Sequence, residues 1–307
     1  MKKHLIWAAA SAALLASCAK EETQTFTPAA TDLPQASITF VAEENADFTR
    51  AFFDNTTTTE AWEQSLSSLT VFCFEEGALV MRRNFTSAEL SSRRSTFALP
   101  RSTAGKSIEF YALANAAVDE NITTKTALLA LTEETPGSYN GTFANVSSKA
   151  LRSGGFLMSG TATKSIGAAG TTTEVAITLR RDVAKVAVQA SLSPAFADKY
   201  PGTVRITSVK LSRSAMQTPY FGGTPKTGAM TFTHTQTPGE TSGRFNALFY
   251  CFENAALASG SRVLLTLDGV YDRDGKTSTT SYQVPISYEF ELSGTAGNGQ
   301  LARNGYY

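Results

Sequence analysis

Side chains suited to catalysis are scarce in this chain of 307 residues. It contains two histidines, and the first, His4, lies in an apolar leader at the N-terminus. A serine–histidine–aspartate set would therefore have to use His234, which lies in an alternating polar stretch with no nucleophile motif beside it. A metal site built from several histidines is ruled out by the same count. We predict that the protein is not an enzyme and has neither a metal nor a cofactor.

Two further features argue against phosphate-bearing partners. Gly105-Lys106-Ser107 resembles the end of a phosphate-binding loop, but Pro100 stands where that motif needs its first glycine, and a strand-like run follows where a helix is needed. The net charge also argues against a polyanionic partner. Without Lys2 and Lys3 the chain has 25 basic and 27 acidic residues, so it carries no excess of positive charge. We therefore predict no nucleic-acid partner.

Cys18 is the side chain whose setting predicts a defined reaction. Lys2 and Lys3 precede an apolar run from Leu5 to Ala16, which suits a signal-peptide core and falls short of the about 20 apolar residues that span a bilayer. Leu15-Ala16-Ser17-Cys18 resembles the bacterial lipobox, whose cysteine receives acyl chains such as palmitate and becomes the first mature residue. We predict a lipoprotein signal peptide over residues 1–17 and a cell-surface protein anchored in the outer membrane through Cys18. The alternative is an ordinary signal peptide with a chance cysteine.

The remaining thiols and cations are assigned structural roles. Cys73 and Cys251 lie in apolar, strand-like runs in different halves of the chain, so buried free thiols are favoured over a disulfide. Three adjacent arginine pairs are expected to face the solvent: Arg82-Arg83, Arg93-Arg94 and Arg180-Arg181.

The spacing of apolar residues indicates a β protein. Residues 18–36 are polar and interrupted by prolines, as in a flexible tether. From Ile38 onward, short β-rich runs alternate with turn-forming clusters, and helical signals are confined to about residues 60–66 and 126–131. We predict an all-β fold of two Greek-key-like, transthyretin-like β-sandwich domains in tandem, over residues 37–173 and 174–307. The boundary follows the Gly/Ala/Thr-rich stretch 167–173.

Two strands have especially clear patterns. Val175, Ile177 and Leu179 alternate strictly, and the parity changes at Val183, which suggests a bulge. Near the end of the chain, every even position is apolar: Tyr282, Val284, Ile286, Tyr288, Phe290 and Leu292. These six side chains should share one sheet face, and Pro285, which lacks an N–H, predicts an edge position or a bulge.

Short motifs follow one another along about residues 38–307, each of them weak alone. They are Trp62-Glu63 with the run 69–80, Phe97–Pro100 with Phe110–Asn115, Phe156–Gly160 with Leu179–Val186, Phe249–Asn254, and Arg303-Asn304 with Tyr306. Their types and order resemble those of a fimbrillin, the subunit of the type V pili that are made from lipoprotein precursors. The resemblance implies a fimbrial subunit that serves adhesion.

The same resemblance implies a route of assembly. In that family an arginine-specific protease cleaves after an arginine near the N-terminus and removes the lipidated segment with the first strand. The matching position here is Thr49-Arg50-Ala51, after the strand that contains Ile38 and Phe40. The vacated groove would then accept a strand from another fimbrial subunit. The alternative function is a non-polymerising outer-surface lipoprotein that binds a glycan or a host ligand.

The C-terminal end differs from the family pattern. Fimbrillins usually continue past the segment that Arg303-Asn304 and Tyr306 resemble into at least one more strand, whereas this chain stops at Tyr307. We therefore expect an exposed sheet edge in the C-terminal half, beside the strand 282–292. This edge should be closed by another segment or by a strand borrowed from a partner.

Overall fold

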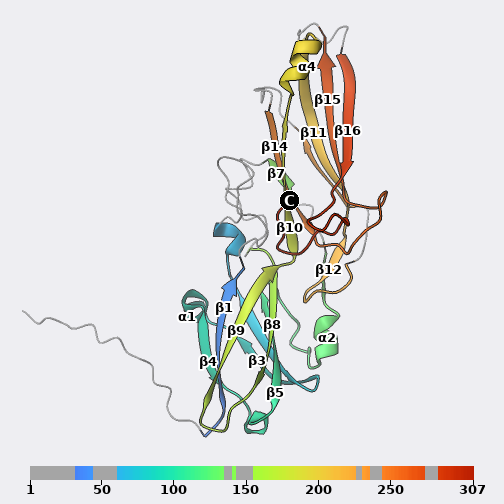
Figure 1. Ribbon diagram of the computed structural model, residues 1–307. Helices are drawn as coiled ribbons and strands as arrows, with labels where there is room; N and C mark the ends of the chain where they lie inside the picture. Colours follow the sequence, from blue (N-terminus) through green and yellow to red (C-terminus); the bar gives the residue numbers. More distant parts are fainter. Residues whose placement is uncertain are drawn as a thin grey trace, which may run out of the picture.

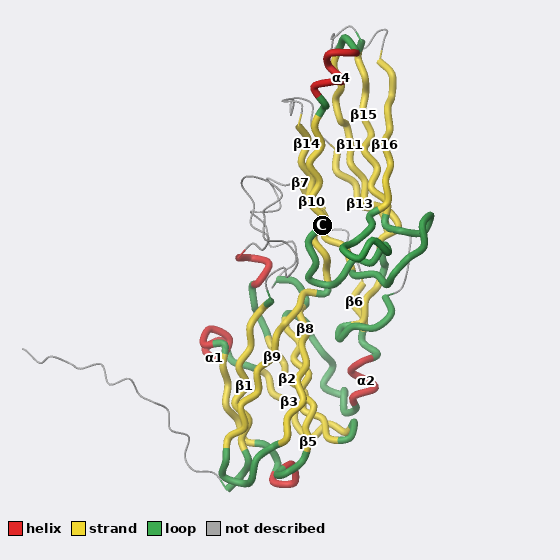
Figure 2. The backbone as a smooth tube through the Cα atoms, in the orientation of Figure 1, coloured by secondary structure: helices red, strands yellow, loops and turns green. Residues whose placement is uncertain are grey.

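The computed structural model describes residues 32–43, 61–134, 140–142, 155–225, 230–235, 244–273 and 283–307. Strands dominate this part of the chain, and the helices are short (Figures 1 and 2). The predicted all-β fold class is thus confirmed. No helix among these residues is long and apolar enough to cross a membrane.

Seven strands form the sheet of the first half. Its order is β3-β2-β5-β8-β9-β1-β4. The strands are β1 (Gln35–Ala42), β2 (Leu69–Glu75), β3 (Ala78–Asn84), β4 (Arg94–Ala98), β5 (Ser107–Ala114), β8 (Met158–Ser165) and β9 (Thr172–Arg181). The register of β8 with β9 consists of two residue pairs at one end of the strands, so the sheet opens there into two layers. We call this the first sandwich.

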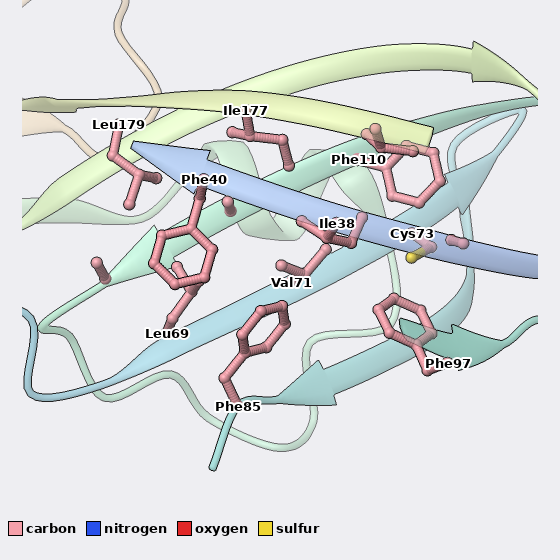
Figure 3. Close-up of a cluster of buried hydrophobic side chains, with 14 of the residues drawn as sticks. Ile38, Phe40, Leu69, Val71, Cys73, Phe85, Phe97, Phe110, Ile177 and Leu179 are labelled. Carbon is pink, nitrogen blue, oxygen red and sulfur yellow. The ribbon is translucent and has the colours of Figure 1, made fainter. Parts of the chain in front are cut away.

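The first sandwich is closed by local turn chemistry and by alternating burial. β2 and β3 form a hairpin whose two turn residues, Glu76 and Gly77, both have positive φ, which suits the right-handed twist of paired strands. In β9, Val175, Ile177 and Leu179 are buried between exposed neighbours, as their alternation predicts. Figure 3 shows the resulting core, to which β1, β2, β5 and β9 all contribute side chains.

The strands from β10 onward, together with the earlier strand β7, form two further sheets that face each other. One has the order β10-β14-β7 and the other the order β13-β11-β15-β16. Their bounds are β7 (Asn140–Thr142), β10 (Val183–Ser191), β11 (Thr203–Ser214), β13 (Met230–Thr235), β14 (Arg244–Phe252), β15 (Leu264–Asp272) and β16 (Gln283–Glu291). Side chains from β10, β11, β13, β14 and β15 share one core between these sheets, which we call the second sandwich. Cys73 and Cys251 are free and buried, one in each core, as predicted.

β9 runs into β10 through one bent residue, Asp182. The parity change predicted at Val183 falls here, but β10 pairs with β14 without a register shift, so the feature is a bend between strands and not a bulge. The predicted domain boundary between residues 173 and 174 stays a prediction. Because β9 packs in the first core and β10 in the second, we propose Asp182 as the boundary.

Small elements connect the strands. They are η1 (Ala61–Gln64), α1 (Ser87–Ser92), η2 (Arg101–Thr103), α2 (Lys125–Leu129), α4 (Pro194–Lys199), and the paired strands β6 (Thr132–Glu134) and β12 (Gln217–Pro219). The helical signals at residues 60–66 and 126–131 correspond to η1 and α2. The sequence reasoning missed α1 and α4.

A capping box, which is readable from the sequence, begins α1. Thr86 accepts a hydrogen bond from the backbone of Glu89, whose side chain bonds back to Thr86. Burial works to raise the pKa of the Glu89 carboxyl, but hydrogen bonds from Ser95, Thr86 and Arg83 outweigh it and lower the pKa to about 2.

Candidate functional site

The residues predicted to carry lipidation and cleavage, Cys18, Arg50 and Ala51, lie outside the described part of the chain. The structure does place the element on each side of Arg50. β1 precedes it in sequence and η1 follows it. The site is therefore built from the contacts that hold these two elements.

β1 is an internal strand of the first sandwich. It pairs in parallel with β9 from Gln35↔Thr172 to Ala42↔Leu179, and antiparallel with β4 from Gln35↔Ala98 to Thr39↔Arg94. Neighbouring strands therefore pair with one edge of β1 along its whole length and with the other edge along its first five residues. Taking β1 away would leave a gap one strand wide between β4 and β9.

One face of β1 forms part of the first core. Ala36, Ile38, Phe40 and Ala42 point inward, and Ile38 and Phe40 are 0% and 1% exposed. Figure 3 shows these two side chains directed at apolar residues of the other strands. Burying an isoleucine or phenylalanine side chain stabilises by about 1.5–3 kcal/mol each. β1 is thus held by apolar burial as well as by its backbone pairing.

Polar contacts hold β1 at Ser37, within the strand, and at Glu43, just after its end. The Arg94 guanidinium donates to Ser37 Oγ from Nε and Nη2, at 3.0 and 2.8 Å. Beyond the end of the strand, Arg180 donates to the two carboxylate oxygens of Glu43 at 2.6 and 3.0 Å. The Asn304 amide also donates to Glu43, at 3.4 Å. Residues far along the chain therefore bind the end of β1.

η1 is fixed separately, by a buried charge cluster. The Glu63 side chain is 0% exposed and lies 2.8 Å from Lys185 Nζ and 3.4 Å from Arg181 Nη1. The Tyr250 hydroxyl donates to the same carboxylate. Because Arg181 belongs to β9, and Lys185 and Tyr250 to β10 and β14, Glu63 lies at the junction of the two sandwiches. We call Glu63, Arg181, Lys185 and Tyr250 the junction cluster.

Aromatic packing covers the junction cluster. The Trp62 ring lies 5.5 Å from that of Phe156 and 5.7 Å from that of Tyr250, measured between centroids. On the other side, Lys185 Nζ lies 5.4 Å from the centroid of Tyr306. Both cations are thereby removed from water and face the Glu63 carboxylate, and Lys185 also lies over an aromatic ring.

The expectation that Arg180 and Arg181 both face the solvent is wrong for Arg181. Its side chain is 4% exposed, whereas that of Arg180 is 57% exposed. Neighbours on a strand point to opposite faces, and one of these faces meets η1. Burial lowers the pKa of the Arg181 guanidinium below its ordinary value, and the Glu63 carboxylate opposes that shift. Sequence reasoning missed this cluster, although Trp62-Glu63 was among the motifs it singled out.

The described residues offer little for chemistry. No group of three or more metal-ligating side chains occurs among them. Burial raises the pKa of both free thiols to about 12, so they stay protonated near neutral pH. The main feature of the candidate site is β1, which is held between two strands. The next described element along the chain, η1, is fixed separately by the junction cluster. The fold is all-β, and the site around β1 consists of strand pairing and buried apolar side chains.

A family model for fimbrillin-A associated anchor proteins Mfa1 and Mfa2 matches residues 35–307, and the chain belongs to this family. It is a family of fimbrial proteins and not of enzymes, as predicted. The predicted resemblance to fimbrillins is confirmed, and the protein is a fimbrial or cell-adhesion protein. No curated protein matches the chain.

Solved structures share the fold at low sequence identity. A fimbrilin from Porphyromonas gingivalis superposes with a TM-score of 0.58 at 15% identity, covering 90% of this chain and 88% of that one. A putative cell adhesion protein from Parabacteroides distasonis gives a TM-score of 0.61 at 15% identity, covering 88% and 85%. Another, from Bacteroides eggerthii, gives 0.54 at 17%, covering 86% and 80%.

Proposed function

We propose that this chain is a surface-anchored pilus subunit, lipidated at Cys18, that is cleaved between Arg50 and Ala51 and then accepts a strand of another subunit in place of β1. The observation that carries the proposal is the position of β1. It is buried inside a sheet, yet it is the first described strand and precedes the proposed cleavage site.

The contacts on either side of Arg50 support this cleavage site. β1 is held by β4, β9 and Glu43, whereas η1 is held by the junction cluster. A cut between them would separate β1 from the rest of the chain and leave η1 in place. An outer-membrane anchor at Cys18 would depart with the first fragment.

The loss of β1 would create a strong acceptor for a new strand. Unpaired N–H and C=O groups of β4 and β9 would line the gap, and the places of Ile38 and Phe40 would open onto the apolar core. An extended segment with apolar side chains at alternate positions satisfies both needs. This is the physical reason to expect assembly with other fimbrial subunits.

The alternative, a lipoprotein that binds a glycan, has less support. Trp62 is the one tryptophan outside the predicted signal peptide, and sugar-binding sites commonly need an exposed aromatic platform. Its ring packs against Phe156 and Tyr250 instead. The family description as anchor proteins supports a different variant, in which the chain keeps its lipid and holds other subunits at the cell surface.

The N-terminal residue of the protein on intact cells distinguishes these possibilities. We expect Ala51 as the first residue of the mature form, and Cys18 as the first residue in an Arg50→Ala variant that is lost from sheared pili. Arg101→Ala, at an exposed arginine of η2, is the matched control and should mature normally. Pili that contain the chain with Cys18 still at its N-terminus would overturn the cleavage step. Pili that lack the chain altogether would overturn the fimbrial function.

A further inference from the structure

A short segment from the second half of the chain lies against the first sandwich. It spans residues 217–221, and we call it the strap. Its strand, β12, pairs antiparallel with β6 over three residue pairs. Beyond this strand, the Phe221 ring packs edge-on against the ring of Tyr111 in β5, with 5.1 Å between the centroids. Phe221 thereby joins a cluster around Phe72 and Phe74, on the face of β2 that points away from the first core. Figure 1 shows β12 between the second sandwich and α2.

The guanidinium of Arg303 binds the strap and the first sandwich together. Its Nη2 donates to the Pro219 carbonyl at 2.9 Å, and its Nη1 donates to the Tyr220 carbonyl at 3.0 Å. Nη1 also donates to Ser159 Oγ at 3.0 Å, and the Ser159 hydroxyl donates in turn to the Tyr220 carbonyl. Because Ser159 belongs to β8, one side chain contacts both the strap and a strand of the first sandwich.

Glu253 completes the hydrogen bonding of this guanidinium. Arg303 Nε donates to Glu253 Oε1 at 3.0 Å, and Nη2 donates to the same oxygen. Thr218 Oγ1, in the strap, donates to that oxygen too, at 3.1 Å. The side chains of Arg303 and Glu253 are 13% and 16% exposed. A guanidinium has five N–H donors, and each of those of Arg303 has an acceptor here.

The backbone on either side of Arg303 belongs to the second sandwich. Leu301 is buried in the second core, and its carbonyl accepts the N–H of Asn254 at 2.9 Å. Asn304 donates its N–H to the Val183 carbonyl, in β10, at 2.9 Å. The backbone of Arg303 is therefore fixed to the second sandwich, while its guanidinium is fixed to the first.

We propose that Arg303 is a clamp that holds the two sandwiches at one angle and makes them unfold as a single unit. A guanidinium suits this role because its donors point outward in a rigid plane. Acceptors on β8, on the strap and after β14 must then keep fixed positions around it. A lysine has three donors on one atom and no such plane, so it could not hold all these acceptors at once.

The clamp is separate from the junction cluster and from the place of β1. The junction cluster fixes η1 through Arg181 and Lys185, whereas Arg303 binds β8 and the strap. None of the acceptors of Arg303 lies in β1 or elsewhere before Arg50. The clamp would therefore persist if β1 were cut away, and this inference does not depend on the proposed function.

Differential scanning calorimetry of Arg303→Met tests the coupling of the two sandwiches. Methionine keeps an unbranched apolar chain and removes all the donors. The wild type should melt in one transition, with a ratio of calorimetric to van't Hoff enthalpy of about 1. In Arg303→Met the ratio should rise toward about 2, because the two sandwiches then melt separately. A two-state transition in Arg303→Met, or two transitions in the wild type, would overturn the clamp.

Arg213→Met is the matched control. Arg213 pairs with Glu291 at 3.0 Å and donates to the Gly260 carbonyl, so it loses similar bonds within the second sandwich alone. Its melting temperature can fall, but the enthalpy ratio should stay at about 1. A ratio that rises equally in both variants would show that any lost arginine contact has this effect, and the clamp would be wrong.

Hydrogen exchange followed by mass spectrometry gives a second readout, segment by segment. The slowest amides of both cores should exchange together in the wild type, at the rate of global unfolding. In Arg303→Met we expect the rates of the two cores to differ by about tenfold or more, and the strap to lose protection. Ser159→Ala, which removes one acceptor and folds more readily, should change both in the same direction by less. Arg303→Lys should resemble Arg303→Met, and wild-type exchange in Arg303→Lys or Ser159→Ala would overturn the proposal.

Discussion

Replacing Glu63 by glutamine should destabilise the protein far more than the loss of an ordinary ion pair. The substitution keeps the size of the side chain and an oxygen that can accept the Tyr250 hydroxyl, but it removes the negative charge. Arg181 and Lys185 would remain buried, with side chains 4% and 3% exposed, without the carboxylate that compensates them. Breaking a buried ion pair from one side costs about 3–5 kcal/mol. We expect a loss of free energy of unfolding in that range.

Urea denaturation followed by fluorescence measures this loss at the right place. Trp62 adjoins Glu63 and is the one tryptophan outside the predicted signal peptide, so its emission reports on the junction of the sandwiches. Glu174→Gln is the matched control, because its ion pair with Arg94 joins side chains that are 63% and 54% exposed. Such surface pairs contribute about 0–1 kcal/mol. Far-ultraviolet circular dichroism follows the strands in the same titration.

The double variant Glu63→Gln/Lys185→Met tests the cause. Removing one of the two uncompensated cations should make it more stable than Glu63→Gln alone, since an apolar side chain of similar length then fills the site. A Glu63→Gln variant within about 1 kcal/mol of the wild type would refute the reasoning. The reasoning would also be refuted if the double variant lost as much free energy of unfolding as Glu63→Gln and Lys185→Met lose together as single variants.

Three further outcomes follow from single residues. Phe40→Ala should lower the free energy of unfolding by about 3–5 kcal/mol. Val41 is 52% exposed on the opposite face of the same strand, so Val41→Ala should lower it by less than about 0.5 kcal/mol. Similar losses for the two variants in urea titration would contradict this prediction. Because the pKa of the Glu89 carboxyl drops from 4.5 to about 2 on folding, its stabilising contribution is complete above about pH 4.5 and is lost as the pH falls toward 2. Melting temperatures measured against pH should therefore fall less steeply in this range for Glu89→Gln, and an unchanged slope would count against the assignment. The thiols of Cys73 and Cys251 should resist maleimide at pH 8 and react on unfolding in urea, whereas rapid labelling of the native chain would contradict their burial.

Patterns within single strands were readable from the sequence. The alternation of Val175, Ile177 and Leu179 identified the buried face of β9, and Pro285 identified β16 as an edge strand. These features depend on local geometry, in which side chains alternate between two faces and a residue without an N–H avoids internal strands. The fold class followed from many such patterns together.

Features that depend on distant partners were not readable. Glu63 and Arg181 are 118 positions apart, and which arginine of the pair 180–181 points inward is decided by where η1 packs. In the same way, the pattern of β16 predicts one apolar face but not whether that face is covered, and Tyr288 and Phe290 on it are 66% and 39% exposed. Whether other elements cover such a face is not encoded in the strand itself.

The place of β1 in its sheet also determines when it can pair during folding. Glu43, just past its end, binds Arg180, which lies 137 positions further along the chain. β1 has two neighbours in its sheet, β4 and β9. Until β9 has been synthesised, β1 can pair only with β4, over five residue pairs. Contacts between such distant segments form late, because a long loop must close before they contribute. The first described strand is thus expected to be among the last to pair, when most of the first sandwich has already formed. The proposed addition of a foreign strand would repeat this final step of folding between two chains.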